Sequence, residues 1–178
     1  MMGYYKRDDL TNEVIDKDGW FHTGDIGELS KDGFLKITDR KKEIFKTSGG
    51  KYIAPQVMEN KFKESRSIEQ IMVIGESQKM PAAFIVPAFE FVTNWAKEQG
   101  ITINSNDELI KNEAVIAHIQ KEVDLYNQNF GKWEQIKKFE LLPSEFTVES
   151  GELTPTLKFK RKIIMEKHQD SFDKIYNS

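Results

Sequence analysis

The stretch DRKKEIFKTSGGK, residues 39–51, decides how the fold is organised. Its first four residues are all charged, as in a linker, whereas Ile44-Phe45 is an apolar pair and Gly49-Gly50 interrupts regular structure. The residues before this stretch predict a β-hairpin, and those after it predict helices mixed with strands. The predicted fold class is therefore α+β: a hairpin, a hinge, and a small antiparallel sheet flanked by helices.

The hairpin is predicted within residues 26–38. Two short β-type runs, Ile26-Gly27-Glu28-Leu29 and Phe34-Leu35-Lys36-Ile37, lie on either side of the turn Lys31-Asp32-Gly33. The second run is followed by Asp39 to Lys42, four charged residues with no apolar residue among them, which are typical of a linker.

Apolar periodicity organises the rest of the chain. Pro55 marks the first turn of a helix over 54–65, whose inward face carries Val57, Met58 and Phe62. The other expected elements are an antiparallel pair over 68–74 and 82–89, a helix over 89–98, a long helix from Ser105 or Asn106 to Phe130, a strand over 136–142, and a terminal helix from Lys160 onward.

The composition limits the class of protein. A length of 178 residues predicts one domain, or one domain plus a fragment. The absence of cysteine excludes a disulfide scaffold and any thiolate metal site or nucleophile, and a net charge of −3 argues against a dedicated nucleic-acid binder. The longest apolar run, 82–89, is too short to cross a bilayer, and the start carries no signal region, so a cytoplasmic location is expected.

Positive charge is concentrated in two segments. Residues 39–51 hold five basic and two acidic side chains, and a second basic run, Lys158 to Lys162, lies near the C-terminus. Two basic segments in an acidic chain suit a small polyanion better than a long nucleic acid. The alternative is that both basic segments are simply exposed to solvent and bind no ligand, and composition alone favours this alternative.

Three motifs are each weak alone, but their order and spacing together are specific. Trp20-Phe21-His22-Thr23-Gly24-Asp25 precedes the hairpin, Asp39-Arg40-Lys41-Lys42-Glu43 follows it, and Ser48-Gly49-Gly50-Lys51 comes next. Together they resemble the C-terminal part of the adenylate-forming enzymes, the AMP-dependent synthetases and ligases. The ending, Leu153 to Arg161, resembles the long-chain fatty-acid–CoA ligase branch, and the resemblance runs from about Gly3 to the end of the chain.

The resemblance implies two half-reactions and two domains. A fatty-acid carboxylate attacks the α-phosphate of ATP, giving acyl-adenylate and pyrophosphate, and the thiol of coenzyme A then expels AMP. Residues 1–39 would end a large N-terminal domain, and residues 40–178 would be a mobile C-terminal domain that rotates between the two steps. Mg²⁺ is implied by the ATP chemistry, whereas no metal ligand is expected in this chain, because its three histidines are isolated.

For residues 25–46 the resemblance assigns three roles. Asp25 and Arg40 would hold the ribose of the nucleotide. Lys42 would be the hinge, with Lys41 as the rival position, because neighbouring residues share a change of backbone torsion. Lys46 would face the active site during thioester formation and offset charge on the departing AMP. Without the resemblance, Asp25 is explained as a turn aspartate that bonds to the local backbone, and the basic residues are explained as ordinary surface cations.

The glycine segment is expected to serve coenzyme A. In the family, Gly49 and Gly50 line the pantetheine tunnel, where a side chain would block entry, and Lys51 would meet the nucleotide of coenzyme A. An ordinary β-turn explains the two glycines as well, so both interpretations stay open here.

Lys158 matches the adenylation lysine, which reaches both the substrate carboxylate and the α-phosphate. Most relatives carry Ser-Gly before this lysine, whereas this chain has Thr156-Leu157, as the long-chain branch does. Lys160 lies two residues further on and is the alternative register. Lys158 is preferred, because Lys160-Arg161 continues into the expected terminal helix.

The chain lacks the Gly/Ser/Thr-rich phosphate-binding loop of the large domain, so we expect it to be inactive alone and to need that domain as its partner. Two alternatives remain: a non-catalytic module that binds nucleotide or coenzyme A or regulates a partner, and an adenylating enzyme that loads a carrier protein. Fatty substrates are compatible with peripheral contact at the inner membrane face, although no amphipathic anchor is evident.

Overall fold

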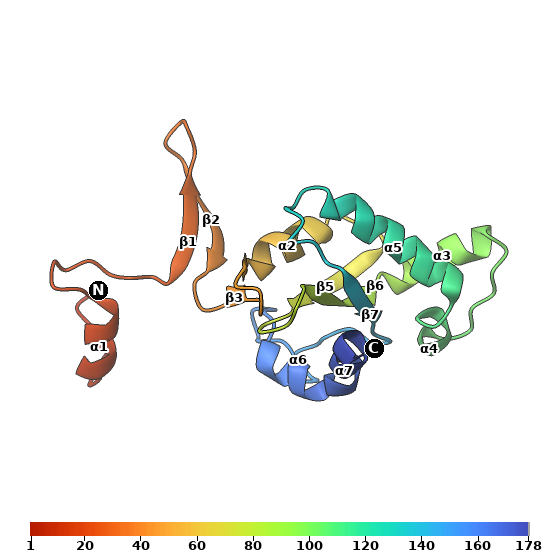
Figure 1. Ribbon diagram of the computed structural model, residues 1–178. Helices are drawn as coiled ribbons and strands as arrows, with labels where there is room; N and C mark the ends of the chain where they lie inside the picture. Colours follow the sequence, from red (N-terminus) through yellow and green to blue (C-terminus); the bar gives the residue numbers. More distant parts are fainter. Residues whose placement is uncertain (178) are drawn as a thin grey trace. The chain divides into compact units, whose positions relative to one another are not determined.

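A computed structural model describes residues 1–177, except for the side chain of Asp39. By its internal contacts the chain divides into two compact units, Met1–Ile44 and Phe45–Ser178 (Figure 1). Each unit is considered by itself.

The first unit contains the predicted hairpin and one unexpected helix. Strands β1 (Asp25–Leu29) and β2 (Leu35–Arg40) pair antiparallel, which confirms the hairpin. Its turn is closed by Ser30, whose N–H donates to the carbonyl oxygen of Phe34 at 2.8 Å and whose Oγ accepts the Phe34 N–H at 3.0 Å. Helix α1 (Asp8–Val14) was not predicted, because none of its residues is buried and it has no apolar stripe to detect.

The two faces of the hairpin differ in character. One face carries the paired residues Leu29 and Leu35 and the pair Gly27 and Ile37. The side chains on this face are largely exposed: Leu29 by 72%, Leu35 by 67% and Ile37 by 57%. On the other face Lys36 Nζ lies 3.6 Å from Glu28 Oε1. None of the described residues of the first unit is buried, so this unit has no core of its own.

A three-stranded sheet organises the second unit. Its strands are β5 (Ile68–Ile74), β6 (Ala82–Pro87) and β7 (Lys138–Leu141), with β6 in the centre. β5 and β6 are antiparallel as predicted, whereas β7 runs parallel to β6, so the sheet is mixed rather than wholly antiparallel. The chain returns from β6 to β7 through three helices, and a crossover of that length permits a parallel strand.

Helices cover both faces of this sheet (Figure 1). One face packs against α2 (Pro55–Phe62), α3 (Phe89–Glu98), α4 (Asn106–Leu109) and α5 (Glu113–Asn127). The other packs against α6 (Arg161–Lys167) and α7 (Gln169–Asn177). Successive residues of β5 and β6 alternate between the two apolar clusters, as the two-residue period of a strand requires.

Two predicted helices are interrupted. The long helix expected from Ser105 to Phe130 is α4 followed by α5, because Asn112 caps a new helix by accepting the N–H groups of Ala114 and Val115 at 3.0 and 3.3 Å. The terminal helix is likewise divided into α6 and α7 at His168. Within the described residues, no helix is both long and apolar enough to span a membrane.

The helix predicted over 54–65 forms as α2, and Met58 and Phe62 are buried as expected. Val57 is exposed, so the prediction that it faces inward is wrong. Before α2, the short strands β3 (Phe45–Lys46) and β4 (Tyr52–Ile53) pair around the glycine segment.

Candidate functional site

Asp25 and Arg40 are paired residues at the open end of the β1–β2 hairpin. They are partners in the strand register, and Arg40 Nε lies 2.9 Å from Asp25 Oδ1. The Asp25 side chain is about three-quarters covered, whereas the Arg40 guanidinium is half exposed. Strand pairing therefore brings together two side chains that are 15 positions apart, leaving polar groups of both signs beside each other.

A hydrogen-bonded turn follows Arg40. Glu43 and Ile44 donate their N–H groups to the Arg40 carbonyl oxygen at 2.9 and 3.3 Å, and the Lys41 N–H donates to the Gly24 carbonyl oxygen at 2.8 Å. Lys41 and Lys42 are both exposed in this turn. The two hinge candidates thus lie at the end of the first unit, where the backbone leaves regular structure.

The glycine loop, residues 47–51, joins β3 to β4 in the second unit. Thr47 closes it: its N–H donates to the Lys51 carbonyl oxygen at 2.9 Å, and its Oγ1 accepts the Lys51 N–H at 3.2 Å. Gly50 has a φ of +80°, a backbone conformation that L residues rarely adopt, so the second glycine is required by the turn itself. Gly49 has an ordinary φ and an open surrounding.

Aromatic rings lie beside Lys46, which precedes this loop, and Lys51, which ends it, and the sequence alone did not indicate these contacts. Lys46 Nζ lies 5.5 Å from the ring centre of Tyr52, and Lys51 Nζ lies 5.6 Å from that of Trp133. Both rings are largely exposed. Trp133 follows α5 and is far from Lys51 in sequence, so only the tertiary fold brings the pair together.

Lys158 lies at the end of a tight turn that we call the Lys158 hairpin, residues 153–159. The Thr154 N–H donates to the Lys158 carbonyl oxygen at 2.8 Å, and Thr154 Oγ1 accepts the Lys158 N–H at 3.1 Å. Leu153 and Phe159 pair as an antiparallel bridge at the base. The hairpin thus presents an exposed ammonium group from a hydrogen-bonded backbone.

The two candidate adenylation lysines have different settings. Lys160 is half-buried, its N–H donates to the Glu152 carbonyl oxygen at 2.8 Å, and it directly precedes α6. Lys158 is exposed and outside the helix. The geometry therefore favours Lys158 as the group that can reach a ligand.

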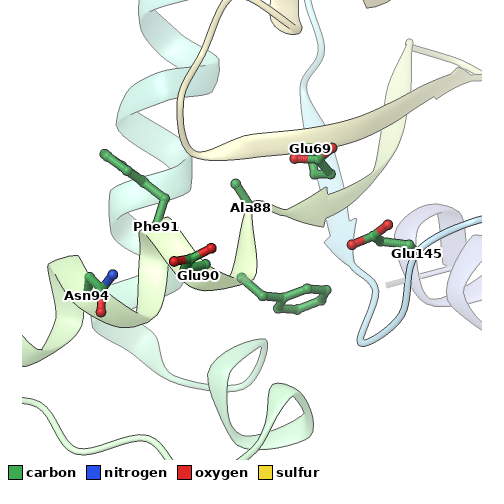
Figure 2. A pocket seen from close by; sticks show the side chains of 7 residues that line it. Glu69, Ala88, Glu90, Phe91, Asn94 and Glu145 are labelled. Carbon is green, nitrogen blue, oxygen red and sulfur yellow. The ribbon is translucent and has the colours of Figure 1, made fainter.

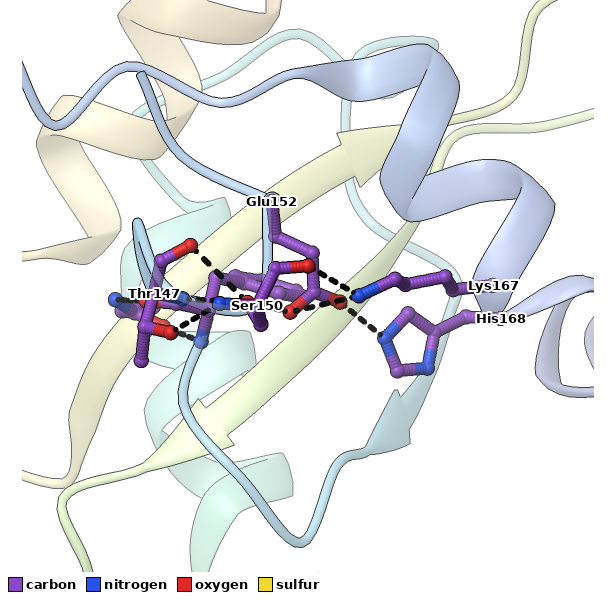
Figure 3. A network of polar contacts seen from close by, with 7 residues as sticks. Thr147, Ser150, Glu152, Lys167 and His168 are labelled. Carbon is purple, nitrogen blue, oxygen red and sulfur yellow. Dashed lines mark hydrogen bonds and ion pairs between the residues drawn. The ribbon is translucent and has the colours of Figure 1, made fainter. Parts of the chain in front are cut away.

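A polar network around the buried side chain of Glu152 supports the segment that leads into the hairpin (Figure 3). The buried carboxylate of Glu152 lies 3.0 Å from His168 Nε2 and 3.9 Å from Lys167 Nζ, and it accepts a hydrogen bond from Ser150 Oγ. Thr147 and Ser150 exchange side-chain and backbone hydrogen bonds in the same loop. The network ties residues 147–153 to the end of α6.

A groove of about 500 Å³ runs beside the Lys158 hairpin. It is lined in part by buried Phe146, exposed Leu157, and Lys63. Glu69, Glu145 and Glu149 also line this groove, so the groove itself disfavours a phosphate-bearing ligand.

A second hollow, of about 660 Å³, is shown in Figure 2. Glu69, Glu90 and Glu145 contribute carboxylates to it, and none of the predicted site residues lines it. Three carboxylates disfavour a phosphate-bearing ligand there, so this hollow does not compete with the basic loops as a nucleotide site.

A metal site was not expected in this chain. Among the described residues, no three metal-ligating side chains lie close enough to hold an ion.

Comparison with known proteins covers nearly the whole chain. Residues 42–178 match the family described as AMP-binding enzyme C-terminal domain. The Mycobacterium tuberculosis long-chain fatty-acid–CoA ligase FadD15 is 39% identical over 176 residues, which is 98% of this chain and 29% of that protein. Human long-chain fatty-acid–CoA ligase 1 is 40% identical over 179 residues, which is 99% of this chain and 26% of that protein.

A solved structure is similar in fold. The A domain of a carboxylic acid reductase from Segniliparus rugosus, in complex with AMP and a co-purified carboxylic acid, is 25% identical with a TM-score of 0.80. The match covers 98% of this chain and 26% of that chain. The present chain therefore spans less than a third of the length of each of these relatives.

Proposed function

The chain belongs to the family of AMP-binding enzyme C-terminal domains, and we propose that it is the C-terminal part of a long-chain fatty-acid–CoA ligase. The reaction would join a fatty acid to coenzyme A through an acyl-adenylate, with ATP converted to AMP and pyrophosphate. The observation that carries the proposal is an exposed Lys158 on a hydrogen-bonded hairpin, in a chain that is about 40% identical to such ligases along its length.

Lys158 is assigned to the adenylation step. Negative charge redistributes over the carboxylate and the α-phosphate oxygens as pyrophosphate leaves, and an ammonium group fixed beside them stabilises that transition state more than the ground state. The exposure of Lys158 supports this assignment over Lys160, whose backbone is held at the start of α6.

Asp25 and Arg40 are assigned to the ribose. A carboxylate can accept both vicinal hydroxyl groups, and an adjacent guanidinium offers additional fixed donors. The pairing of the two side chains at 2.9 Å supports this role, because one ligand group could contact both.

The glycine loop is assigned to thioester formation. Gly49 has open space where a Cβ would be, as needed for a pantetheine chain that passes close to the backbone. Lys46 would offset charge on the departing AMP, and Lys51 would contact the nucleotide of coenzyme A. The aromatic partners of both lysines, Tyr52 and Trp133, add flat apolar surface beside the charges.

The remaining site would be supplied by a preceding large domain, to which residues 1–39 would belong, while residues 40–178 rotate about Lys42, or its neighbour Lys41. The uncovered apolar face of the β1–β2 hairpin supports this partner, since a face of that kind needs a covering surface. Such an enzyme would act in the cytoplasm or at the inner face of a membrane, where its fatty substrate partitions.

The experiment grafts this chain in place of the matching segment of FadD15, with palmitate, ATP and coenzyme A as substrates. We expect the chain alone to release no pyrophosphate and the folded chimera to form palmitoyl-CoA. In the chimera, Lys158→Ala should slow pyrophosphate release by about 100-fold and spare thioester formation from supplied acyl-adenylate.

Lys162→Ala is the matched control, because Lys162 is an exposed lysine on α6 and should leave both half-reactions unchanged. An equal loss in both half-reactions for Lys158→Ala would remove the adenylation role. Pyrophosphate release by the chain alone would contradict the need for a partner domain.

A second candidate function is favoured by one comparison. The solved relative with AMP is a carboxylic acid reductase, so the same domain type is not restricted to coenzyme A ligases. The acyl group could instead pass to a carrier protein, or the chain could serve as a non-catalytic nucleotide-binding module. The higher identity to coenzyme A ligases favours the first proposal, and a competition assay offering coenzyme A and carrier protein to the chimera decides between acceptors.

A further inference from the structure

A buried ion pair joins α2 to the first residue of α6, which follows the Lys158 hairpin in sequence. Glu59, on α2, is 4% exposed, and Arg161, the first residue of α6, donates from Nη2 to both of its carboxylate oxygens at 2.7 and 2.8 Å. Arg161 Nη1 also donates to the Val73 carbonyl oxygen at 3.1 Å, and the Val73 N–H donates back to Glu59 Oε1 at 2.8 Å. The pair therefore joins α2, β5 and α6 at a single point.

Stability alone is a weak reason for this arrangement. Burial raises the pKa of the Glu59 carboxyl to about 7, although Arg161 and the Val73 N–H act in the opposite direction. Apolar side chains of similar volume often stabilise a fold as well as a buried ion pair does, whereas the planar fork of arginine fixes direction as well as distance. The arrangement is thus better suited to holding a geometry than to adding stability.

The Glu59–Arg161 pair lies where it can fix the orientation of the Lys158 hairpin. Arg161 is three residues after Lys158, and the intervening Phe159 packs edge-on against Phe146 with ring centres 5.5 Å apart. Lys63, the residue that follows α2, has its Nζ 5.6 Å from the ring centre of Phe159. Glu59 of α2 and Lys63 at its end therefore contact the chain at Arg161 and Phe159, shortly after Lys158.

We propose that Glu59 and Arg161 are positioning residues that hold the Lys158 hairpin in the orientation adenylation requires. This inference rests on the proposed function for its catalytic consequence, but not for its structural one. Without the arginine fork, the hairpin should remain attached through Phe159 yet lose its fixed direction. The adenylation step should then be slower. The glycine loop should be unaffected, because its Ser48 N–H donates to the Gln78 carbonyl oxygen and not to the hairpin.

The structural consequence is tested in the 178-residue chain by amide hydrogen exchange. In the double variant Glu59→Met with Arg161→Met, which leaves no unpaired buried charge, the amides of Leu157 and Lys158 should exchange at least about tenfold faster. The amides of β5 and β6 should keep their rates, except that of Val73, which loses its acceptor Glu59. Ser65→Ala is the control: it removes a part-buried hydrogen bond between Ser65 and Glu122 of α5, and it should leave the exchange of residues 154–160 unchanged. Unchanged exchange in the hairpin, or equal acceleration throughout the second unit, would overturn the proposal.

If the double variant fails to fold, Arg161→Lys decides, because it keeps the charge and loses the two-pronged contact. The same selective acceleration at Leu157 and Lys158 is expected, with a smaller size. Uniform or absent acceleration in this variant again overturns the proposal.

The catalytic consequence is tested in the FadD15 chimera. Arg161→Lys should lower kcat for pyrophosphate release by about tenfold with little change in KM for ATP, and should spare thioester formation from supplied acyl-adenylate. Loss in both half-reactions would make Arg161 merely structural. If Lys158→Ala itself leaves adenylation intact, the proposed function fails while the exchange result still decides the positioning role.

Discussion

Leu157 is the residue in the Lys158 hairpin whose backbone is under strain. Its φ is +58°, in the left-handed region, and its side chain is 71% exposed, so burial does not compensate for the conformation. Its N–H donates to the Thr154 carbonyl oxygen at 2.8 Å, which keeps the turn closed. Glycine adopts a left-handed φ of this kind without steric cost.

Leu157→Gly should therefore raise the free energy of unfolding. Relief of the left-handed conformation contributes about 1–2 kcal/mol, and the greater freedom of glycine in the unfolded chain takes back about half of it, leaving about 0.5–1 kcal/mol. Chemical denaturation of the parent and the variant measures the difference. Leu125→Gly, at an exposed site inside α5, is the matched control and should lose about 1 kcal/mol; a destabilised Leu157→Gly would show that the turn is not strained.

At the scale of elements, α5 is anchored to the start of β5 by two polar contacts. Ser67 Oγ lies 2.9 Å from His118 Nε2, and Ser65 Oγ donates to Glu122 Oε2 at 2.6 Å. Trp95 of α3 stacks on the His118 ring with centres 4.1 Å apart. Burial lowers the pKa of the His118 imidazole below its usual value of 6.5, with a smaller contribution from Lys121, against the opposing effect of Glu122.

This shift predicts a pH-dependent stability. As pH falls through about 6.5 the unfolded chain takes up the histidine proton first, so the stability that neutral His118 contributes is lost as pH falls through its lower folded pKa. Urea unfolding between about pH 7.5 and 5 should therefore show a steeper acid-side loss for the parent than for His118→Gln. Glu59, whose raised pKa favours the folded state at low pH, contributes equally to the parent and to His118→Gln, so its effect cancels in the difference between them. Identical pH profiles for the two proteins would contradict the lowered pKa of His118.

At the scale of the whole molecule, the two units are unequal. The second unit buries a complete two-sided core, whereas no described residue of the first unit is buried. The segment that ends the first unit, with Lys41 and Lys42, makes backbone hydrogen bonds to Gly24 and Arg40 of the same unit. This organisation is compatible with a domain that changes its orientation about the segment.

Lys42→Pro tests that motion in the FadD15 chimera. Proline fixes φ, so each half-reaction measured separately should persist while the coupled turnover falls by about tenfold. Lys42→Ala keeps the backbone free and should behave like the parent. Full turnover in Lys42→Pro would exclude a hinge at this residue.

Short-range patterns in the sequence determined much of this protein. The β1–β2 hairpin, α2, α3 and the antiparallel β5–β6 pair follow from turn residues and apolar periods, which act over a few residues. The order of the three motifs likewise indicated the family, because it depends on spacing along the chain.

Only the tertiary structure decided the remainder. The parallel placement of β7, the contact of Lys51 with Trp133, and the Glu59–Arg161 pair each join residues far apart in sequence. Such contacts depend on how helices and strands pack around a shared core, which no local pattern encodes. The setting that distinguishes exposed Lys158 from half-buried Lys160 has the same origin, since it depends on where the hairpin meets α6.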